Sequence, residues 1–244
     1  MPASVDLNAD VGEGFPNDES LLRFVSSANI ACGFHAGDAG SMRWLCEACA
    51  ERGVAVGAQV SYRDRAGFGR RDVEIGYDDL LVDLAEQVAE LGSAATAAGI
   101  AVRYLKPHGA LYNRAVWDRE QARAVVDAAG GLPVLGLPGS VLLEYAAESG
   151  VDAVREFFAD RAYEPDGTLV HRSEPDAVIS SVTAVAERVA GFVDAGLVMA
   201  RDGTAMPMSA ESICVHGDTE GAIDLARAIS GVLGERGVSI TCFA

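Results

Sequence analysis

Short apolar runs alternate with longer amphipathic segments through most of the chain. The apolar runs predict seven strands, at residues 4–9, 29–34, 54–60, 101–106, 132–136, 154–158 and 212–216. The amphipathic segments predict six helices, at residues 38–52, 77–98, 119–129, 140–149, 182–195 and 219–236. Because the strands are almost continuously apolar, they are typical of a parallel sheet covered on both faces.

Glycine and hydroxyl residues mark several helix ends. Gly53 and Gly99 lie just past predicted helices, as C-caps do. Thr219 and Glu220 follow the last predicted strand, where they could cap the final helix. These signals support the helix boundaries drawn from the hydrophobic pattern.

Alternating strands and helices predict either a doubly wound sheet or a barrel. A nucleotide-binding sheet would favour a G-x-G-x-x-G turn after the first strand, but the chain has Asp10-Val11-Gly12-Glu13-Gly14-Phe15-Pro16 there, whose acidic groups would repel a pyrophosphate. About seven strand–helix units, with polar strand ends in every part of the chain, favour an irregular barrel of the TIM type. Since no linker, low-complexity segment or clear repeat interrupts the pattern, residues 1–244 are expected to form one domain.

Composition narrows the classes of function. The net charge of −17 argues against broad nucleic-acid binding and against anchoring to anionic lipid, although a local basic cluster could still take a small anion. The sequence contains no apolar stretch of the roughly 18 to 20 residues that a membrane span needs. The opening residues 1–4 carry no signal-like segment, so a cytoplasmic location is expected.

The five cysteines predict packing rather than chemistry. Cys46 and Cys49 form a C-x-x-C inside a predicted helix, where this spacing places both on one apolar face. Core packing is therefore favoured over redox or zinc chemistry, because no second cysteine pair or nearby histidine completes a zinc set. Cys32 and Cys214 lie in buried-strand patterns and are expected to behave as small hydrophobes.

Reactive side chains stand at or near the ends of four of the apolar runs. These groups include Asp10, His35, Lys106 with His108, and His216. Because the carboxyl ends of parallel strands open onto one face, residues that are distant in sequence are expected to share a pocket there. The loops at residues 67–71 and 165–168 follow the third and sixth strands and would lie on the same side.

Asp10 and His35 could hold a metal or form an acid–base pair. The third strand ends in Gln59, whose neutral amide is a poor ligand for transition metals. We therefore expect no tightly bound metal, with Asp10 and His35 as the only candidate ligands. The alternative is that both side chains merely hydrogen-bond at strand ends.

Lys106 and His108 flank Pro107 and would point to the same side of an extended chain. Lys106 is the only lysine beside 18 arginines, and it could bind phosphate or carboxylate, or act as a nucleophile if desolvated. Asn113 could serve the same pocket. The segment from His216 to Asp218 could offer backbone N–H groups to an anion, although helix capping explains Asp218 equally well. His171 has no surrounding motif and is expected to be exposed.

Five motifs in order along the chain closely resemble the LamB/YcsF family, whose members are the A component of the bacterial 5-oxoprolinase. They are Asp6-Leu7-Asn8-Ala9-Asp10 with Gly12-Glu13, the run from Ser26 to Asp38, Lys106-Pro107-His108-Gly109-Ala110-Leu111-Tyr112-Asn113, Phe158-Ala159-Asp160-Arg161-Ala162-Tyr163, and Cys214-Val215-His216-Gly217-Asp218. The resemblance covers nearly the whole chain. It implies a seven-stranded (β/α) barrel related to carbohydrate deacetylases, ATP-dependent opening of the 5-oxoproline lactam to L-glutamate with Mg²⁺, and two partner subunits, B and C.

The resemblance also implies roles for particular residues. Asp10, His35, Lys106 and His108 would be catalytic. Substrate or phosphate would be bound by Asn8, Glu13, Asp38, Gln59, Asn113, Asp160, Arg161 and His216. Lys106 and Arg161 would neutralise a phosphoryl group, while Asp10, Glu13, His35 or His108 would move protons. Many relatives carry histidine and proline at the positions of Gln59 and Val60, and this departure weakens any inherited metal site.

Two other functions stay open at this point. One is a metal-dependent deacetylase or amidohydrolase that acts alone. The other is a non-catalytic subunit that binds substrate and presents it to partners.

Overall fold

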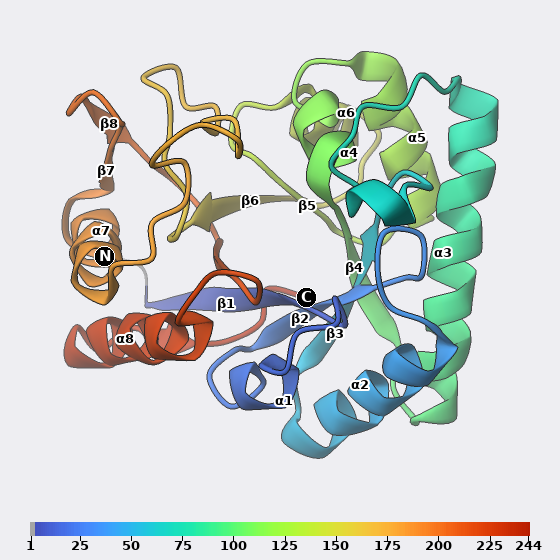
Figure 1. The fold of residues 1–244 in the computed structure, drawn as a ribbon, viewed down its shortest axis with the longest axis horizontal. Coiled ribbons are helices and arrows are strands. Elements are labelled where there is room, and N and C mark those ends of the chain that lie inside the picture. The colour runs from blue at the N-terminus through green and yellow to red at the C-terminus, as the bar shows by residue number, and fades with distance from the viewer. Residues whose placement is uncertain (1–2) are drawn as a thin grey trace.

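Seven parallel strands close into a barrel in the computed structural model, which describes residues 3–244 (Figure 1). The strands are β1 (Ser4–Val11), β2 (Ser27–Ala31), β3 (Ala55–Val60), β4 (Val102–Pro107), β5 (Val134–Gly136), β6 (Ala153–Phe158) and β9 (Ser212–His216). β9 pairs in parallel with both β6 and β1, which closes the ring. The expected seven-stranded α/β barrel is therefore confirmed, and the predicted strand bounds differ from the observed ones by a few residues at most. Met1 and Pro2, which belong to the opening segment used to argue location, lie outside the described residues.

Helices surround the strands on the outside (Figure 1). The long ones are α2 (Ala39–Arg52), α3 (Tyr77–Ala97), α5 (Arg119–Ala129), α6 (Val141–Glu148), α7 (Val182–Ala195) and α8 (Ala222–Glu235). All six were predicted from the amphipathic pattern. In the part of the chain described here, no helix combines the length and apolar character that crossing a membrane requires.

Several short elements were not predicted. They are α1 (Asp18–Leu21), the single 3-10 turn η1 (Arg65–Gly67), α4 (Gly109–Ala115), the antiparallel pair β7 (Leu197–Met199) and β8 (Ala205–Pro207), and β10 (Ser239–Ile240), which pairs with the start of β1. α4 shows why such elements depend on tertiary contacts. Its first residue, Gly109, has φ +59°, and a Cβ there would lie 2.3 Å from the carbonyl oxygen of Gly69.

The predicted helix ends are mostly found, with one exception. Gly53 ends α2 in the left-handed conformation with φ +68°, and Gly99 follows the end of α3 with φ +76°. The prediction that Thr219 caps the last helix is wrong, because α8 begins after Gly221. The Thr219 hydroxyl instead donates a hydrogen bond to Asp160 Oδ2 at 2.7 Å. The hydroxyl that was expected to cap the helix thus donates to the buried carboxylate of Asp160 instead.

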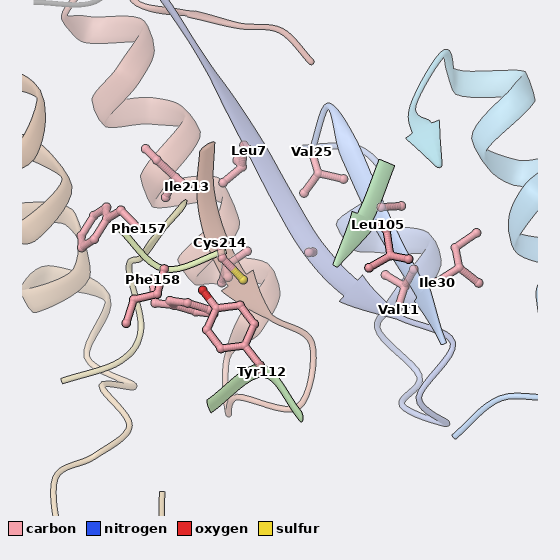
Figure 2. Close-up of a cluster of buried hydrophobic side chains, with 14 of the residues drawn as sticks. Leu7, Val11, Val25, Ile30, Leu105, Tyr112, Phe157, Phe158, Ile213 and Cys214 are labelled. Carbon is pink, nitrogen blue, oxygen red and sulfur yellow. The ribbon is translucent and has the colours of Figure 1, made fainter. Parts of the chain in front are cut away.

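The core lies between the barrel and its helices and also fills part of the barrel itself (Figure 2). Cys46 and Cys49 are buried in it on the inner face of α2, and burial raises the pKa of the two thiols to about 11 and about 12. Cys32 and Cys214 are fully buried in the same core. The expectation that these cysteines pack rather than react is consistent with this placement.

Candidate active site

The polar strand ends converge at the carboxyl-terminal mouth of the barrel. They surround a cavity of about 420 Å³. Its lining includes polar groups from five segments, namely Asp10, Arg70, Lys106, His108, Asn113, Arg161, His171, Arg172, Ser173 and His216. Tyr112, Phe158 and Leu169 give the same cavity an apolar side. The predicted convergence of residues from distant parts of the sequence is therefore what the fold produces.

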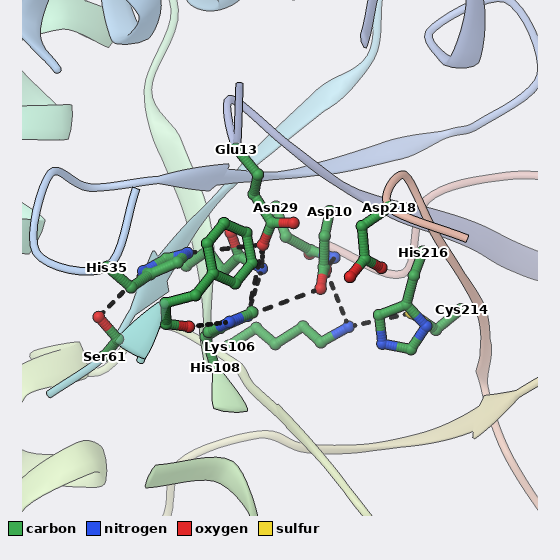
Figure 3. A network of polar contacts seen from close by, with 12 residues as sticks. Asp10, Glu13, Asn29, His35, Ser61, Lys106, His108, Cys214, His216 and Asp218 are labelled. Atoms are coloured by element: carbon green, nitrogen blue, oxygen red, sulfur yellow. Dashed lines mark hydrogen bonds and ion pairs between the residues drawn. The ribbon is translucent and has the colours of Figure 1, made fainter. Parts of the chain in front are cut away.

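Lys106 lies on the floor of this cavity between the carboxylates of Asp10 and Glu156. Figure 3 shows its ammonium beside Asp10. Its Nζ is 2.9 Å from Glu156 Oε2 and 3.3 Å from Asp10 Oδ1, and the residue is only 2% exposed. Burial by itself would lower the pKa of Lys106, but the charges of Asp10 and Glu156 more than offset this and raise the pKa well above its usual value. This direction favours the charged ammonium, and the predicted roles of Lys106 stay predictions.

Asp10 is the counterpart of this ammonium and lines the cavity itself. Burial would raise the pKa of its carboxyl, but the charge of Lys106 holds the pKa well below the usual value. Oδ1 accepts hydrogen bonds from Asn29 at 2.8 Å and from Lys106 at 3.3 Å. Oδ2 lies 3.9 Å from His108 Nδ1. Two hydrogen bonds thus hold Oδ1 of Asp10 in place, while the nearest charged neighbour of Oδ2 is the more distant His108.

A chain of amides holds this ion pair in place. The Asn8 amide donates to Ser212 Oγ at 2.7 Å, and its oxygen accepts from both Asn29 and Lys106. Asn29 in turn accepts from the Tyr104 hydroxyl at 2.6 Å. Asn8 is completely buried and is not part of the cavity lining, so its predicted contact with a ligand stays a prediction.

Glu156 is the main residue that sequence reasoning missed. It is fully buried in β6, and its contact with Lys106 lies outside the direction of a hydrogen bond, so neither oxygen has a directed donor among residues 3–244. The Tyr112 hydroxyl, also missed, is likewise buried without a partner, and burial followed by the Glu156 charge raises its pKa well above the usual value. An acidic residue inside an apolar strand was the available signal for Glu156.

Two histidines stack on each other beside the cavity, which His108 lines and His35 does not. The rings of His35 and His108 have centroids 4.0 Å apart and planes inclined by 12°. Phe68, from the loop after β3, packs edge-on against both rings. Glu13 Oε1 lies 3.5 Å from His35 Nε2 and 3.4 Å from His108 Nδ1, so the predicted residues Glu13, His35 and His108 form one cluster.

Hydrogen bonds fix where the histidine protons are. His108 Nε2–H donates to the Phe68 carbonyl at 3.2 Å, and its Nδ1 accepts from the Gln59 amide at 3.0 Å. The Ser61 hydroxyl donates to the Tyr62 carbonyl and therefore accepts from His35 Nδ1–H. Burial, followed by the proximity of His108, lowers the pKa of His35 to about 4. His35 is accordingly neutral near pH 7.

Glu13, His35 and His108 are the donor groups here that come closest to a metal-ligand set, because one ligand atom of each lies within 4.8 Å of the others. Their geometry does not fit a shared ion. An imidazole binds a metal along its ring plane, and two stacked rings only 12° from parallel cannot both aim at one point. In addition, Gln59 Nε2 already donates to Glu13 at 2.9 Å and to His108, where a cation would otherwise lie. The expectation of no tightly bound metal stays a prediction, which this geometry supports.

His216 forms a pair with Asp160 on the opposite wall. His216 Nδ1 lies 2.9 Å from Asp160 Oδ1, and the backbone N–H of His216 donates to Asp160 Oδ2 at 3.1 Å. Burial would raise the pKa of Asp160, but His216 and the hydrogen bonds hold it below the usual value. The Asp160 carboxylate thus already accepts from the His216 backbone N–H, while anion binding by the other backbone N–H groups of residues 216–218 stays a prediction. The ring of His216 instead lines the cavity.

Some of the remaining predicted residues lie at the cavity and others lie away from it. Arg161 is buried at the cavity wall, and Asn113 is exposed at its rim. Asp38 is not brought to the site, because it is the exposed N-cap of α2 and accepts from the Ser41 N–H at 2.9 Å. Asp218 does not cap a helix but pairs with Arg70 and Arg172. His171 is exposed as predicted, although it also borders the cavity.

Comparisons with known proteins agree with this arrangement. The LamB/YcsF family model matches residues 5–244. A Streptomyces griseus protein, named as the A component of 5-oxoprolinase, is 55% identical over 98% of this chain and all of its own length. The crystal structure of a lactam utilization protein from Thermus thermophilus is 38% identical, covers 98% of this chain and all of its own, and superposes with a TM-score of 0.91. A polysaccharide deacetylase from Bacillus cereus, 15% identical over 99% of this chain and 92% of its own, shares the fold with a TM-score of 0.54. The chain belongs to the LamB/YcsF family.

Proposed function

We propose that this chain is the A component of a 5-oxoprolinase, which opens the lactam of 5-oxo-L-proline to L-glutamate with hydrolysis of ATP, together with two partner subunits, B and C. The observation that carries the proposal is the cavity, in which an ionised Asp10 and an Asp160-bound His216 face the same space. Identity of 55% over nearly the full length to a protein named for this enzyme supports the choice of substrate. A cytoplasmic location is part of the same proposal.

A five-membered lactam is a stable amide, so its opening needs activation. Transfer of the γ-phosphoryl group of Mg²⁺-bound ATP to the lactam oxygen would make C5 electrophilic and leave ADP. Water then adds to C5, and the C5–N bond breaks as the nitrogen takes up a proton. A second water hydrolyses the resulting acyl phosphate to L-glutamate and phosphate. We assign the phosphoryl transfer to the assembled complex.

The two proton transfers suit two groups on facing walls. Asp10 has its Oδ1 held by Asn29 and Lys106, so Oδ2 is the oxygen proposed to take the proton from the attacking water. Asp160 holds Nδ1 of His216 and thereby directs the other ring nitrogen to the ring nitrogen of the substrate as a proton donor. Lys106 keeps Asp10 ionised and acts through it, since its ammonium is occupied by Asp10 and Glu156. The stacked pair His35 and His108 is proposed to shape the neighbouring floor.

The test is glutamate release from 5-oxoproline with ATP and Mg²⁺, measured for this chain alone and after mixing with its B and C partners. Glutamate is expected only from the mixture. Asp10→Asn should reduce turnover by about a hundredfold or more while the complex still assembles. Asp38→Asn, outside the site, is the matched control and should turn over normally. An assembled complex that releases no glutamate would refute the assignment.

The same experiment separates the other two functions. A deacetylase or amidohydrolase acting alone would show activity without partners and would lose it with a chelator. A presenting subunit would bind 5-oxoproline in calorimetry, yet Asp10→Asn and His216→Asn would leave turnover of the complex unchanged.

A further inference from the structure

Three arginines gather on one side of the cavity, and we name them the arginine corner: Arg70, Arg161 and Arg172. Arg70 comes from the loop after β3, whereas Arg161 and Arg172 come from the long segment between β6 and α7. The chain carries a net charge of −17, so a cluster of three positive side chains is opposite in sign to the charge of the whole protein. The corner therefore needs a local explanation.

Arg161 has the least compensated charge of the three. It is 6% exposed, and among the described residues no carboxylate oxygen lies within 4.0 Å of its guanidinium. Its Nε donates to the Ala177 carbonyl at 3.1 Å and its Nη2 to the Val170 carbonyl at 2.7 Å. The guanidinium is thus held rigidly at the cavity wall by neutral acceptors. Burying a cation in this way is costly unless an anion joins it.

Arg70 and Arg172 share a single counter-ion. Arg70 Nη2 lies 2.6 Å from Asp218 Oδ2, and Arg172 Nη2 lies 2.7 Å from the same oxygen. The nearby carboxylate of Asp160 is committed to His216 and Thr219. The three guanidinium groups of the corner are thus accompanied by one carboxylate, Asp218, which pairs with Arg70 and Arg172 only. The positive charge of the corner therefore exceeds the negative charge beside it.

We propose that the arginine corner is an oxyanion-binding subsite, built to take a carboxylate or a phosphoryl group of the ligand that fills the cavity. Guanidinium groups match the paired oxygens of both anions. The identity of that ligand rests on the proposed function. The apolar side chains of Tyr112 and Phe158 line the same cavity as the corner and as Asp10, which suits a small ring. With its carboxylate on the corner, 5-oxoproline would present its lactam to Asp10 and His216.

Calorimetry on the full chain tests the subsite directly, with three probes. The probes are 5-oxoproline, 2-pyrrolidinone, which is the same lactam without the carboxylate, and inorganic phosphate. Arg161→Gln should weaken an oxyanion by about tenfold to a hundredfold, which is the range for a lost charge-assisted hydrogen bond. Asp218→Asn should strengthen it, because a competing carboxylate is removed. Arg236→Gln, which loses an arginine paired with Asp194 outside the cavity, is the matched control and should change nothing.

The probes distinguish the source of the oxyanion. If the corner binds the substrate carboxylate, the affinity for 5-oxoproline should depend on Arg161. The affinity for 2-pyrrolidinone should be lower and independent of Arg161, and phosphate should compete poorly with 5-oxoproline. A phosphoryl group predicts Arg161-dependent phosphate binding that leaves room for 5-oxoproline. Because Arg161→Gln also loses two backbone contacts, the partly exposed Arg172→Gln repeats the test in a variant that keeps them.

The inference is overturned if folded Arg161→Gln and Arg172→Gln bind 5-oxoproline and phosphate as the unaltered chain does. It is also overturned if Asp218→Asn weakens both anions. Failure of the proposed function looks different, since a complex that makes no glutamate could still bind oxyanions in an Arg161-dependent way. Conversely, normal turnover with Arg161-independent binding would remove the subsite and leave the function.

Discussion

Replacing Lys106 by methionine removes one buried charge and keeps most of the side-chain volume. In the structure this ammonium lies 2.9 Å from Glu156 and 3.3 Å from Asp10, and both carboxylates are buried. At an effective dielectric constant of about 20, each pair has a gross attraction of about 5 to 6 kcal/mol, most of which offsets desolvation. Breaking a buried ion pair from one side costs about 3 to 5 kcal/mol, because the remaining charge is left uncompensated. That is a large part of the roughly 5 to 15 kcal/mol that stabilises a domain.

The cost should depend on pH with a definite sign. The depressed pKa of Asp10 gives stability that is present above the unfolded value near 3.9 and is lost as the pH falls through the folded value. The raised pKa of Lys106 gives stability that is present below about 10.4 and is lost as the pH rises through the folded value. Between about pH 6 and 9 the unaltered protein has both contributions in full. Without Lys106, burial favours the protonated form of Asp10, so the deficit of the variant should shrink toward pH 5.

Urea unfolding followed by circular dichroism at pH 7.5 and pH 5.5 measures this deficit. Adding Glu156→Gln to Lys106→Met should recover part of it, since one of the two unpaired charges is removed. The control is Arg236→Met, which breaks an exposed pair with Asp194 and should cost less than about 1 kcal/mol. The reasoning is refuted if Lys106→Met costs no more than this control at pH 7.5, or if its deficit is the same at both pH values.

Three further predictions concern stability. Burial lowers the pKa of His35 to about 4. As the pH falls from about 6.5 to 4, the unfolded chain therefore takes up a proton on this residue before the folded chain does. His35 should lower the free energy of unfolding over this range by about 3 kcal/mol in all. Asp18, whose pKa is raised to about 6, changes the free energy of unfolding with pH in the opposite direction. The contribution of His35 is therefore measured by comparing the unaltered protein with His35→Asn in urea titrations across this range. If the free energy of unfolding changed with pH in the same way in both proteins, the prediction would be contradicted. Gly57→Ala should lower the unfolding free energy by about 1 to 3 kcal/mol, because the new Cβ would meet the Tyr104 ring at 2.2 Å. Gly92→Ala, inside α3 with open space around it, should instead raise it by about 0.5 to 1 kcal/mol, and thermal unfolding that ranks the two glycine variants the other way would show the packing to be different.

The sequence predicted the architecture well because each strand and long helix of the barrel has its own local hydrophobic pattern. The near-continuous apolar runs located all seven barrel strands, and the amphipathic segments located all six long helices. The elements it missed are short and depend on distant partners. α4, for example, begins at a glycine that lies against the loop after β3. No window of sequence around residue 109 contains that contact.

The candidate site divides in the same way. Position at the end of a parallel strand was sufficient to find Asp10, His35, Lys106, His108 and His216, because topology alone carries strand ends to one face. Function by residue type was less reliable. Asp38 belongs to the same motif as His35, yet its place at the start of α2 directs it to solvent as an N-cap. Glu156 was missed because its strand reads as buried, and only the closed barrel turns that position toward Lys106.

The sequence by itself determined the fold class, the face that carries the site and most of the polar groups that form it, since these follow from periodicity and strand order. The tertiary structure decided the state and partner of each group. It surrounded Lys106 with two carboxylates, placed the Gln59 amide between Glu13 and His108, and left Arg161 without a carboxylate among the residues described. These outcomes depend on distances between residues that are far apart in the chain, because charge, desolvation and ring orientation act through space.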